Sequence, residues 1–321
     1  MITKVTTSQM RCFKACRKRY ELEYIEGLKP IEEPKPLAIG SMYHAGLELL
    51  LQGAKLGDVI EAVIYDQEVK CDCLNIDVDY YSTYIAVEMI KAFAAESGYQ
   101  NWQILAVEKQ FEVSTGYAKR LCGKIDGLIL NPEDQERYLI EHKTTSQWGE
   151  KYLENLLWDE QSTNYLYAYN QMLEDGIIEG RAVKGIFYNI IEKPTIKPLD
   201  ATPVDKRKYT KDGRLYAGQR ETAETPEELR QRVQAWYAEK SRLHLAYVYR
   251  TPADIAAQID DVNLTIKDMI AAERDKTFYR NPEACKILPC PYKPKCLDNV
   301  PDTDCLFTLK KSKNEELNET C

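Results

Sequence analysis

Charged residues interrupt two of the most apolar segments of this 321-residue chain. The first segment, GKIDGLIL, places Asp126 among aliphatic residues, and the second, YLIEHK, ends with Glu141 and Lys143. Short segments rich in Ile and Leu, separated by the turn signal Asn131 and Pro132, are typical of neighbouring β-strands. Burying a charge is costly unless the charge is paired or bound to a metal. The fold must therefore bring these charged residues to a partner or to a metal ion.

The spacing of the acidic residues and the lysine predicts a shared site. Residues i and i+2 of a strand face the same way, so Glu141 and Lys143 project together and His142 points away. Consecutive strands usually pair, which brings Asp126 to the same place. Two carboxylates can hold Mg²⁺ or Mn²⁺, which polarises a phosphate and activates water, and a lysine can stabilise the transition state. The alternative is a solvent-exposed salt bridge, because an isolated E-x-K is common.

The rest of the chain predicts an α/β fold in which helices flank a central mixed β-sheet. Periodic apolar residues, with Ser8 as a candidate cap, predict helices at 8–24, from about 40, and at 58–70, 83–97, 152–174, 226–247 and 252–275. β-Branched and apolar segments predict strands at 103–113, 117–130, 137–143 and 182–191. We interpret the proline-rich residues 28–36 as a loop and residues 192–224 as a loop or hairpin insertion.

We expect one elaborated domain over residues 1–321. Its parts are helices at 1–100, a sheet core at 101–191, the 192–224 insertion, helices at 225–280, a cysteine-rich segment at 281–309 and a tail at 310–321. No apolar run is long enough to span a bilayer or to resemble a secretory signal, so we expect a cytoplasmic protein with no membrane partner. The net charge of −8 does not exclude nucleic acid, because binding depends on where basic residues gather.

The ordered set of motifs resembles the RecB-like branch of the PD-(D/E)XK nuclease superfamily. Asp126 and E-x-K match the catalytic strands, and IGSMYHAGLELL resembles the G-x-x-x-H helix, here Gly40 and His44. QSTNY resembles the Q-x-x-x-Y motif, here Gln161 and Tyr165, which lie one helical turn apart. The resemblance implies a restriction-endonuclease-like core and a metal held by His44, Asp126 and Glu141, with helical additions at both ends joined at a cysteine cluster.

Cysteines gather near both ends of the chain. Cys285, Cys290 and Cys296 lie within CKILPCPYKPKC, and Cys16 lies in the first predicted helix. Four thiolates can hold Zn²⁺ or an iron–sulfur cluster, and spacing alone leaves both open. The resemblance implies that these four cysteines hold a 4Fe–4S cluster and that Cys12 does not. The spacing C-x4-C-x5-C departs from the family's C-x-x-C-x5-C, which puts Cys285 in doubt.

The resemblance implies a metal-dependent deoxyribonuclease, an exonuclease acting on single-stranded DNA or DNA ends. Such proteins take part in recombination, repair, phage replication and CRISPR adaptation, so a protein partner from one of these pathways is also implied. Two other interpretations stay open on the sequence alone. One is a non-catalytic DNA-binding subunit on the same fold, and the other is an iron–sulfur sensor whose carboxylates are structural.

Overall fold

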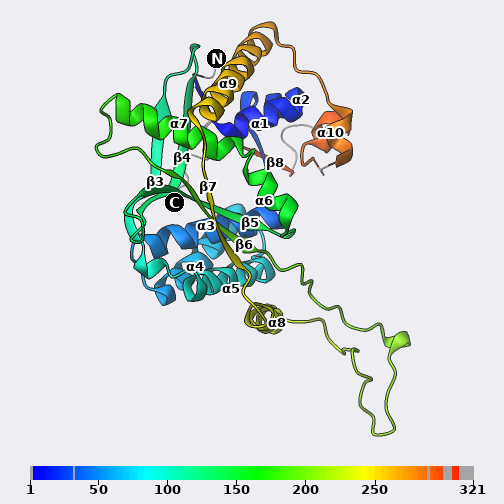
Figure 1. The fold of residues 1–321 in the computed structure, drawn as a ribbon. Helices are drawn as coiled ribbons and strands as arrows, with labels where there is room; N and C mark the ends of the chain where they lie inside the picture. Colours follow the sequence, from blue (N-terminus) through cyan, green and yellow to red (C-terminus); the bar gives the residue numbers. More distant parts are fainter. Residues whose placement is uncertain (1–2, 32, 288–289, 299–305, 311–321) are drawn as a thin grey trace.

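The computed structural model describes residues 3–31, 33–287, 290–298 and 306–310. Its centre is a six-stranded mixed sheet in the order β1-β4-β5-β6-β7, with β3 also paired to β4 (Figure 1). Two strand pairs, β1 with β4 and β5 with β6, are parallel. The predicted α/β class with a mixed central sheet is confirmed. The strands are β1 Lys4–Val5, β3 Gln103–Val113, β4 Arg120–Leu130, β5 Arg137–Thr145, β6 Gly185–Glu192 and β7 Leu243–Val248.

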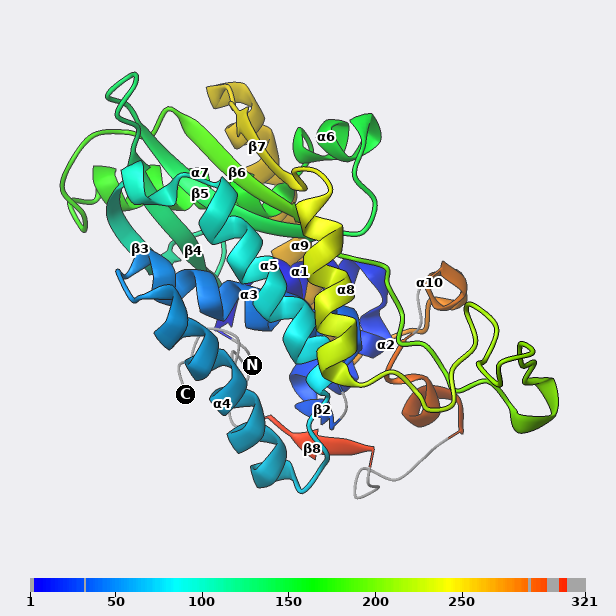
Figure 2. The ribbon, with the colours of Figure 1, turned by 90° about the horizontal axis from the view of Figure 1, so that it is seen from below.

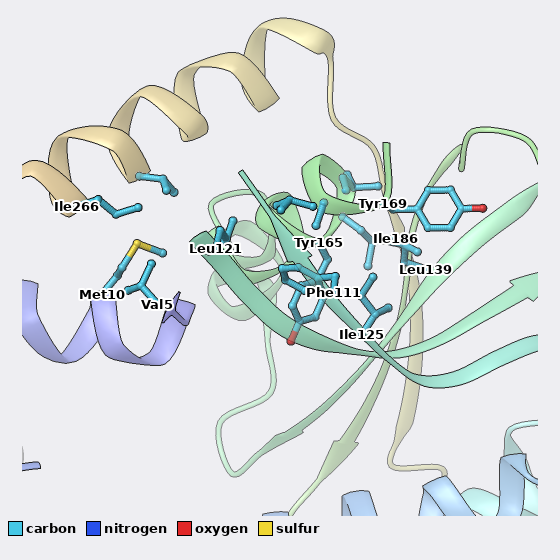
Figure 3. Packing of buried hydrophobic residues seen from close by; sticks show 14 of the residues in the cluster. Val5, Met10, Phe111, Leu121, Ile125, Leu139, Tyr165, Tyr169, Ile186 and Ile266 are labelled. Atoms are coloured by element: carbon cyan, nitrogen blue, oxygen red, sulfur yellow. The ribbon is translucent and has the colours of Figure 1, made fainter. Parts of the chain in front are cut away.

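Helices cover both faces of this sheet (Figures 1 and 2). One face carries α1 Thr7–Ala15, α7 Glu160–Glu174 and α9 Pro252–Asp275. The other carries α3 Lys35–Leu51, α4 Leu56–Leu74, α5 Tyr80–Glu96 and α8 Pro226–Ala238. Figure 3 shows the first core, where Met10, Leu121 and Ile266 join α1, β4 and α9 and where Phe111 packs near Tyr165. The two apolar layers fix the sheet between them and so fix the positions of the predicted site residues.

The predicted helix 8–24 is wrong as one continuous element. It begins with Thr6 rather than Ser8 as its cap, through a capping box with Gln9, and α1 ends at Ala15. Cys16 is extended, with φ −161° and ψ 111°. A short helix α2 Arg17–Tyr20 and a π-helical turn η1 Glu21–Ile25 follow.

Residues 279 and 281 form hydrogen bonds with backbone groups on either side of the interruption at Cys16. The Lys18 N–H donates to the Tyr279 carbonyl at 3.0 Å, and the Asn281 side chain donates to the Ala15 carbonyl at 2.8 Å. These tertiary hydrogen bonds take the place of helical ones, so local sequence could not predict the interruption.

Three other predicted elements need correction. The helix 152–174 is two helices, α6 Glu150–Leu156 and α7, because Asp159 caps α7 and interrupts the first helix. The helix 226–247 ends at Ala238, and Leu243–Val248 form β7, paired antiparallel to β6. The predicted loop 28–36 contains β2 Leu28–Pro30 and the start of α3.

The cysteine-rich segment includes α10 Pro282–Ile287, the π-helical turn η4 Pro294–Asp298 and β8 Phe307–Leu309. β8 pairs antiparallel with β2, so the segment returns to the beginning of the chain. Short 3-10 turns lie at Tyr99–Asn101 and Val204–Lys206. Residues 311–321 of the predicted tail lie outside the described residues. Among the described helices, none combines the length and apolar character needed to cross a membrane.

Candidate active site

The two acidic residues lie where β4 and β5 separate. The β4–β5 ladder ends at the pair Gly127 and Ile140, whereas β5 stays paired with β6 as far as Thr145. Beyond the ladder, the Asp126 carboxylate accepts the His142 N–H at 2.8 Å in place of a backbone carbonyl. The separation therefore opens the sheet beside Asp126 and Glu141 while the side chain of Asp126 keeps the backbone hydrogen bond satisfied.

Both carboxylates are deeply buried, with Asp126 8% and Glu141 2% exposed. Burial, followed by the charge of Glu108, raises the pKa of Asp126 to about 7. Burial raises the pKa of Glu141 to about 8, against the opposing charge of Lys143. Within the part of the chain that the structure describes, Glu141 Oε2 is buried and has no hydrogen-bond partner. A divalent cation would supply that partner and favour the ionised carboxylates, so this donor set fits Mg²⁺ or Mn²⁺.

Lys143 joins the acidic pair to helix α7. Its Nζ donates to Glu141 Oε1 at 2.6 Å and to Gln161 Oε1 at 3.1 Å. Gln161 Nε2 in turn donates to the Tyr165 hydroxyl at 2.7 Å. Burial lowers the pKa of Lys143, but the charges of Glu141 and Asp159 outweigh burial and raise it. The structure thus brings the predicted E-x-K and Q-x-x-x-Y residues into one hydrogen-bonded chain.

Asp159 belongs to this arrangement, although it lies outside the motifs that predicted the site. It lies 3.3 Å from Lys143 Nζ, pairs with Arg11 at 2.6 Å and accepts the Gln161 N–H as the cap of α7. Burial raises the pKa of Asp159, but Lys143 and Arg11 outweigh burial and lower it to about 2. An aspartate followed three residues later by Ser162, within a helical segment, was the available signal for a new helix start.

His44 reaches the same place from α3. Its Nδ1 lies 3.6 Å from Asp126 Oδ2, and its ring meets the ring of His142 edge-on at a centroid distance of 6.0 Å. Burial lowers the pKa of His44, against the charge of Glu141. A neutral imidazole is the form that binds metals. The His142 side chain lies on the opposite face of β5 from Lys143, as strand alternation predicts, where it packs against Phe93 and its Nδ1 lies 2.7 Å from the Asn189 side chain.

A third carboxylate, which the sequence analysis also missed, lies beside Asp126 on strand β3. The flanking pairs of the β3–β4 ladder place Glu108 opposite Asp126. Glu108 has φ 51°, a strained conformation for a strand glutamate, and its carboxylate pairs with Lys124 at 2.5 Å. Burial raises the pKa of Glu108, opposed by Lys124. No local sequence pattern predicts a positive φ inside a strand. Glu108 can therefore be recognised as a site residue only from the fold.

Among the described residues, no group of three or more His, Cys, Asp or Glu side chains is arranged to hold a metal ion. The predicted ligand set of His44, Asp126 and Glu141 therefore does not form a three-ligand site in this structure. Proteins usually bind Mg²⁺ through one or two carboxylates, and water and substrate complete the octahedron. The two carboxylates at the strand separation meet that smaller requirement.

The four predicted cysteine ligands line a single cavity of about 130 Å³. Cys16 comes from the break between α1 and α2, and the other three come from the C-terminal segment. The lining includes Arg19, Leu22, Arg280 and Tyr292. Cys12 is not part of the lining and packs instead into the core beneath α1. These four thiols thus line the same cavity, but they are not positioned as the ligands of one metal ion.

A family model and two solved structures resemble this chain. The family model described as the PD-(D/E)XK nuclease superfamily matches residues 4–297. A solved structure of a protein described as a candidate exonuclease from Eubacterium rectale is similar over 96% of this chain and 90% of its own, with 11% identity and a TM-score of 0.52. The solved structure named SSO0001 has 15% identity over 93% of this chain and 88% of its own, with a TM-score of 0.37. No curated protein matches the chain.

Proposed function

Because the chain belongs to the PD-(D/E)XK nuclease superfamily, and so to the phosphodiester hydrolases, we propose that it is a metal-dependent deoxyribonuclease. The observation that carries the proposal is the buried Glu141, whose Oε1 is held by Lys143 and whose Oε2 has no partner among the described residues, next to Asp126. A cation is the missing partner that this pair of carboxylates needs.

We assign the site residues as follows. Asp126 and Glu141 would hold Mg²⁺ or Mn²⁺, with His44 contributing from α3. The ion, when bound, polarises the scissile phosphate and makes water a better nucleophile. Lys143 stabilises the negative charge that develops on the phosphate, since its ammonium group is held charged by Glu141 and Asp159.

Helix α7 keeps the lysine in place. Gln161 accepts one hydrogen bond from Lys143 and donates another to Tyr165, so the rotamer of the lysine is fixed before substrate arrives. Asp159 adds charge from the cap of the same helix. We propose Asp159 as a positioning residue, because its charge draws the ammonium group toward α7, opposite to the attraction of Glu141.

The proposed substrate is single-stranded DNA or a DNA end, and the proposed reaction is exonucleolytic. The family resemblance supports this, as does the description of the structurally similar protein as a candidate exonuclease. A role in recombination, repair, phage replication or CRISPR adaptation, with a protein partner from that pathway and a cytoplasmic location, belongs to the same proposal.

We further propose that Cys16, Cys285, Cys290 and Cys296 hold a 4Fe–4S cluster, with zinc as the alternative. Their shared cavity supports a common ligand, and Arg19 and Arg280 in its lining would offset the negative charge of four thiolates. Such a ligand would connect the first helices to the C-terminal segment. Iron and zinc analysis of the anaerobically purified protein, together with its visible absorption, distinguishes the two.

The site assignment is tested by replacing Lys143 with alanine and assaying end-labelled single- and double-stranded DNA with and without Mn²⁺. We expect Lys143→Ala to lower the cleavage rate by about 10²- to 10³-fold, the effect of losing one preorganised donor. Lys151→Ala is the matched control, because Lys151 is an exposed lysine on neighbouring α6. A Lys143→Ala protein that cuts DNA at the rate of the control would show that the assignment is wrong.

A further inference from the structure

The segment between β6 and α8 projects from the body of the protein (Figures 1 and 2). We call residues 203–219 the arm. Its two ends are close together, because the Thr202 N–H donates to the Arg220 carbonyl at 2.9 Å and the Arg220 N–H donates to the Thr202 hydroxyl at 3.0 Å. The arm is therefore a loop whose two ends are joined by the hydrogen bonds between Thr202 and Arg220, which we call the neck.

The neck is fixed to the helical layer through Glu224, which is 1% exposed. Its carboxylate accepts the Leu199 N–H at 2.9 Å and pairs with Arg232 on α8 at 2.7 Å. Its carbonyl accepts the hydroxyl of Tyr81 on α5 at 2.5 Å. These contacts of the buried Glu224 with two helices and with Leu199 hold the base of the arm in place, although the arm itself is an extended projection.

The end of the arm is a small hairpin. Tyr209 and Leu215 form an antiparallel bridge, and the Thr210 N–H donates to the Arg214 carbonyl at 2.7 Å. The Gly213 N–H closes the turn on the Thr210 carbonyl at 3.0 Å, and Gly213 has φ 75°, which favours glycine. The tip therefore has a defined backbone on which side chains can be presented.

The charged side chains of the arm are mainly basic, in a chain whose net charge is −8. The arm contains five basic residues and two acidic ones; the basic residues are Lys206, Arg207, Lys208, Lys211 and Arg214. Arg207 donates to the carbonyls of Thr202 and Glu221, and within the described residues none of the other four is paired with a carboxylate. Those four are exposed. Uncompensated ammonium and guanidinium groups on a projection are an electrostatic footprint for a polyanion.

Two tyrosines lie among these charges. Tyr209 and Tyr216 are each 50% exposed, one on each side of the hairpin turn. Large aromatic side chains that are left half exposed next to basic groups are suited to stacking on unpaired bases, while the basic groups follow the phosphates. An acidic protein surface would use the charges but would not need the two rings.

The segment that leads to the arm begins near the proposed active site. The parallel register of β5 and β6 places Lys143 beside Ile190. β6 ends two residues later, at Glu192, and the chain continues directly into the segment that leads to the arm. The segment that leads to the arm therefore leaves the sheet at the end of the strand beside β5, and the neck at Thr202 follows ten residues after Glu192.

We propose that the arm is a second binding surface for the DNA substrate, which contacts the sugar-phosphate backbone outside the active site through Lys206, Lys208, Lys211 and Arg214. The inference rests on the proposed function, since it concerns the same substrate. The arm increases affinity for long DNA and takes no part in hydrolysis. A very short oligonucleotide that occupies only the active site gains nothing from it.

Excision of the arm tests this inference. Joining Thr202 to Arg220 through two glycines removes residues 203–219 and uses the existing neck. Binding is measured by fluorescence anisotropy on labelled DNA of about 30 nucleotides, at several salt concentrations, in the Lys143→Ala background. We expect the Kd to rise about tenfold at low salt and the slope of log Kd against log salt to fall by about 3, as for four lost phosphate contacts to a single strand.

A milder variant serves if the excision disturbs folding. Lys206→Gln, Lys208→Gln and Lys211→Gln together remove three positive charges and leave the hairpin backbone intact. The matched control carries Lys55→Gln, Lys240→Gln and Lys267→Gln, which are exposed lysines elsewhere. Weaker binding by the arm variant alone supports the inference. Equal Kd values and salt slopes for the two variants overturn it.

Different results would contradict the role of the arm and the proposed nuclease site. With Lys143 intact, the arm variants should cleave a very short oligonucleotide at the unmodified rate, and a large decrease would show that the arm acts in hydrolysis rather than in binding. If Lys143→Ala still cleaves DNA, the proposed site is wrong, but the arm can still be judged from its salt slope. If the intact chain binds no DNA, both fall together.

Discussion

The proposed active site and the cysteine cavity are both assembled from distant segments, but by different forces. Around Asp126 and Glu141, two continuous strands and helix α7 are held by apolar layers on both faces of the sheet. Around the cysteines, the residues that the structure describes form a small core of four buried side chains, Leu22, Leu28, Tyr292 and Phe307. The first region is shaped before any ligand binds, whereas the second has little apolar surface to hold its segments together.

This difference implies that the two proposed ligands contribute differently. A divalent cation at Asp126 would complete a site that the fold already provides, and removing it should leave the fold intact. A metal group held by four thiolates would itself join α2 to the C-terminal segment, much as structural metals stabilise domains with small cores. Three predictions test this contrast, in order of decreasing size.

The largest effect is expected from Cys16→Ser, which should remove most of the bound iron or zinc. Because the ligand closes the link between chain segments, hydrogen exchange should accelerate in peptides covering β2 and β8, while peptides covering β4 and β5 keep their protection. Cys12→Ser is the matched control, four residues earlier, because Cys12 does not line the cavity. Metal content and exchange are both measured by mass spectrometry. Full metal content in Cys16→Ser would refute the ligand assignment.

An intermediate effect is expected from pH in the metal-free protein. The pKa values of Asp126 and Glu141 are raised by burial to about 7 and about 8, above the ordinary values of about 4 for an unfolded chain. The unfolded state therefore loses these protons first, so the free energy of unfolding falls as pH rises from about 4 to about 8. Each unit of difference is worth about 1.4 kcal/mol.

The combined variant Asp126→Asn and Glu141→Gln should remove this dependence. Thermal unfolding in the presence of a chelator should show the variant gaining stability over the unmodified protein at pH 8 but not at pH 4. Adding Mn²⁺ at pH 8 should stabilise only the unmodified protein, since it requires the ionised carboxylates. Stabilisation of the variant by Mn²⁺ to the same extent would mean that the ion binds elsewhere.

The active-site residues that could be predicted from the sequence are those whose positions follow from local patterns. Asp126, Glu141 and Lys143 could be placed together because strand alternation and the pairing of consecutive strands are local rules. Asp159 had a local capping signal that was overlooked within a longer helical pattern. Glu108 could not be found, because its position depends on a positive φ within β3. The strand β7 was missed because its alternation in LHLAYV follows directly on a helical pattern.

The N-terminal region was harder to predict for a physical reason. The interruption at Cys16 depends on hydrogen bonds from residues 279 and 281, more than 250 residues away. Local propensity favours one continuous helix there, and only the returning chain overrides it. The family resemblance implied that the two ends meet at the cysteines, but it could not indicate that the helix breaks at Cys16, which lines the cavity.

The smallest effect is expected in α1, the helix that connects the two regions. Thr6 caps α1, Arg11 on α1 pairs with Asp159, and the helix ends beside Cys16. Thr6→Ala removes the cap and should cost about 1 kcal/mol, which lowers the melting temperature by about 2 °C in a domain of this size. If the regions are independent, cleavage rate and metal content stay unchanged. A fall in both, measured on the same preparation, would show that α1 couples the cysteine cavity to the lysine through Asp159.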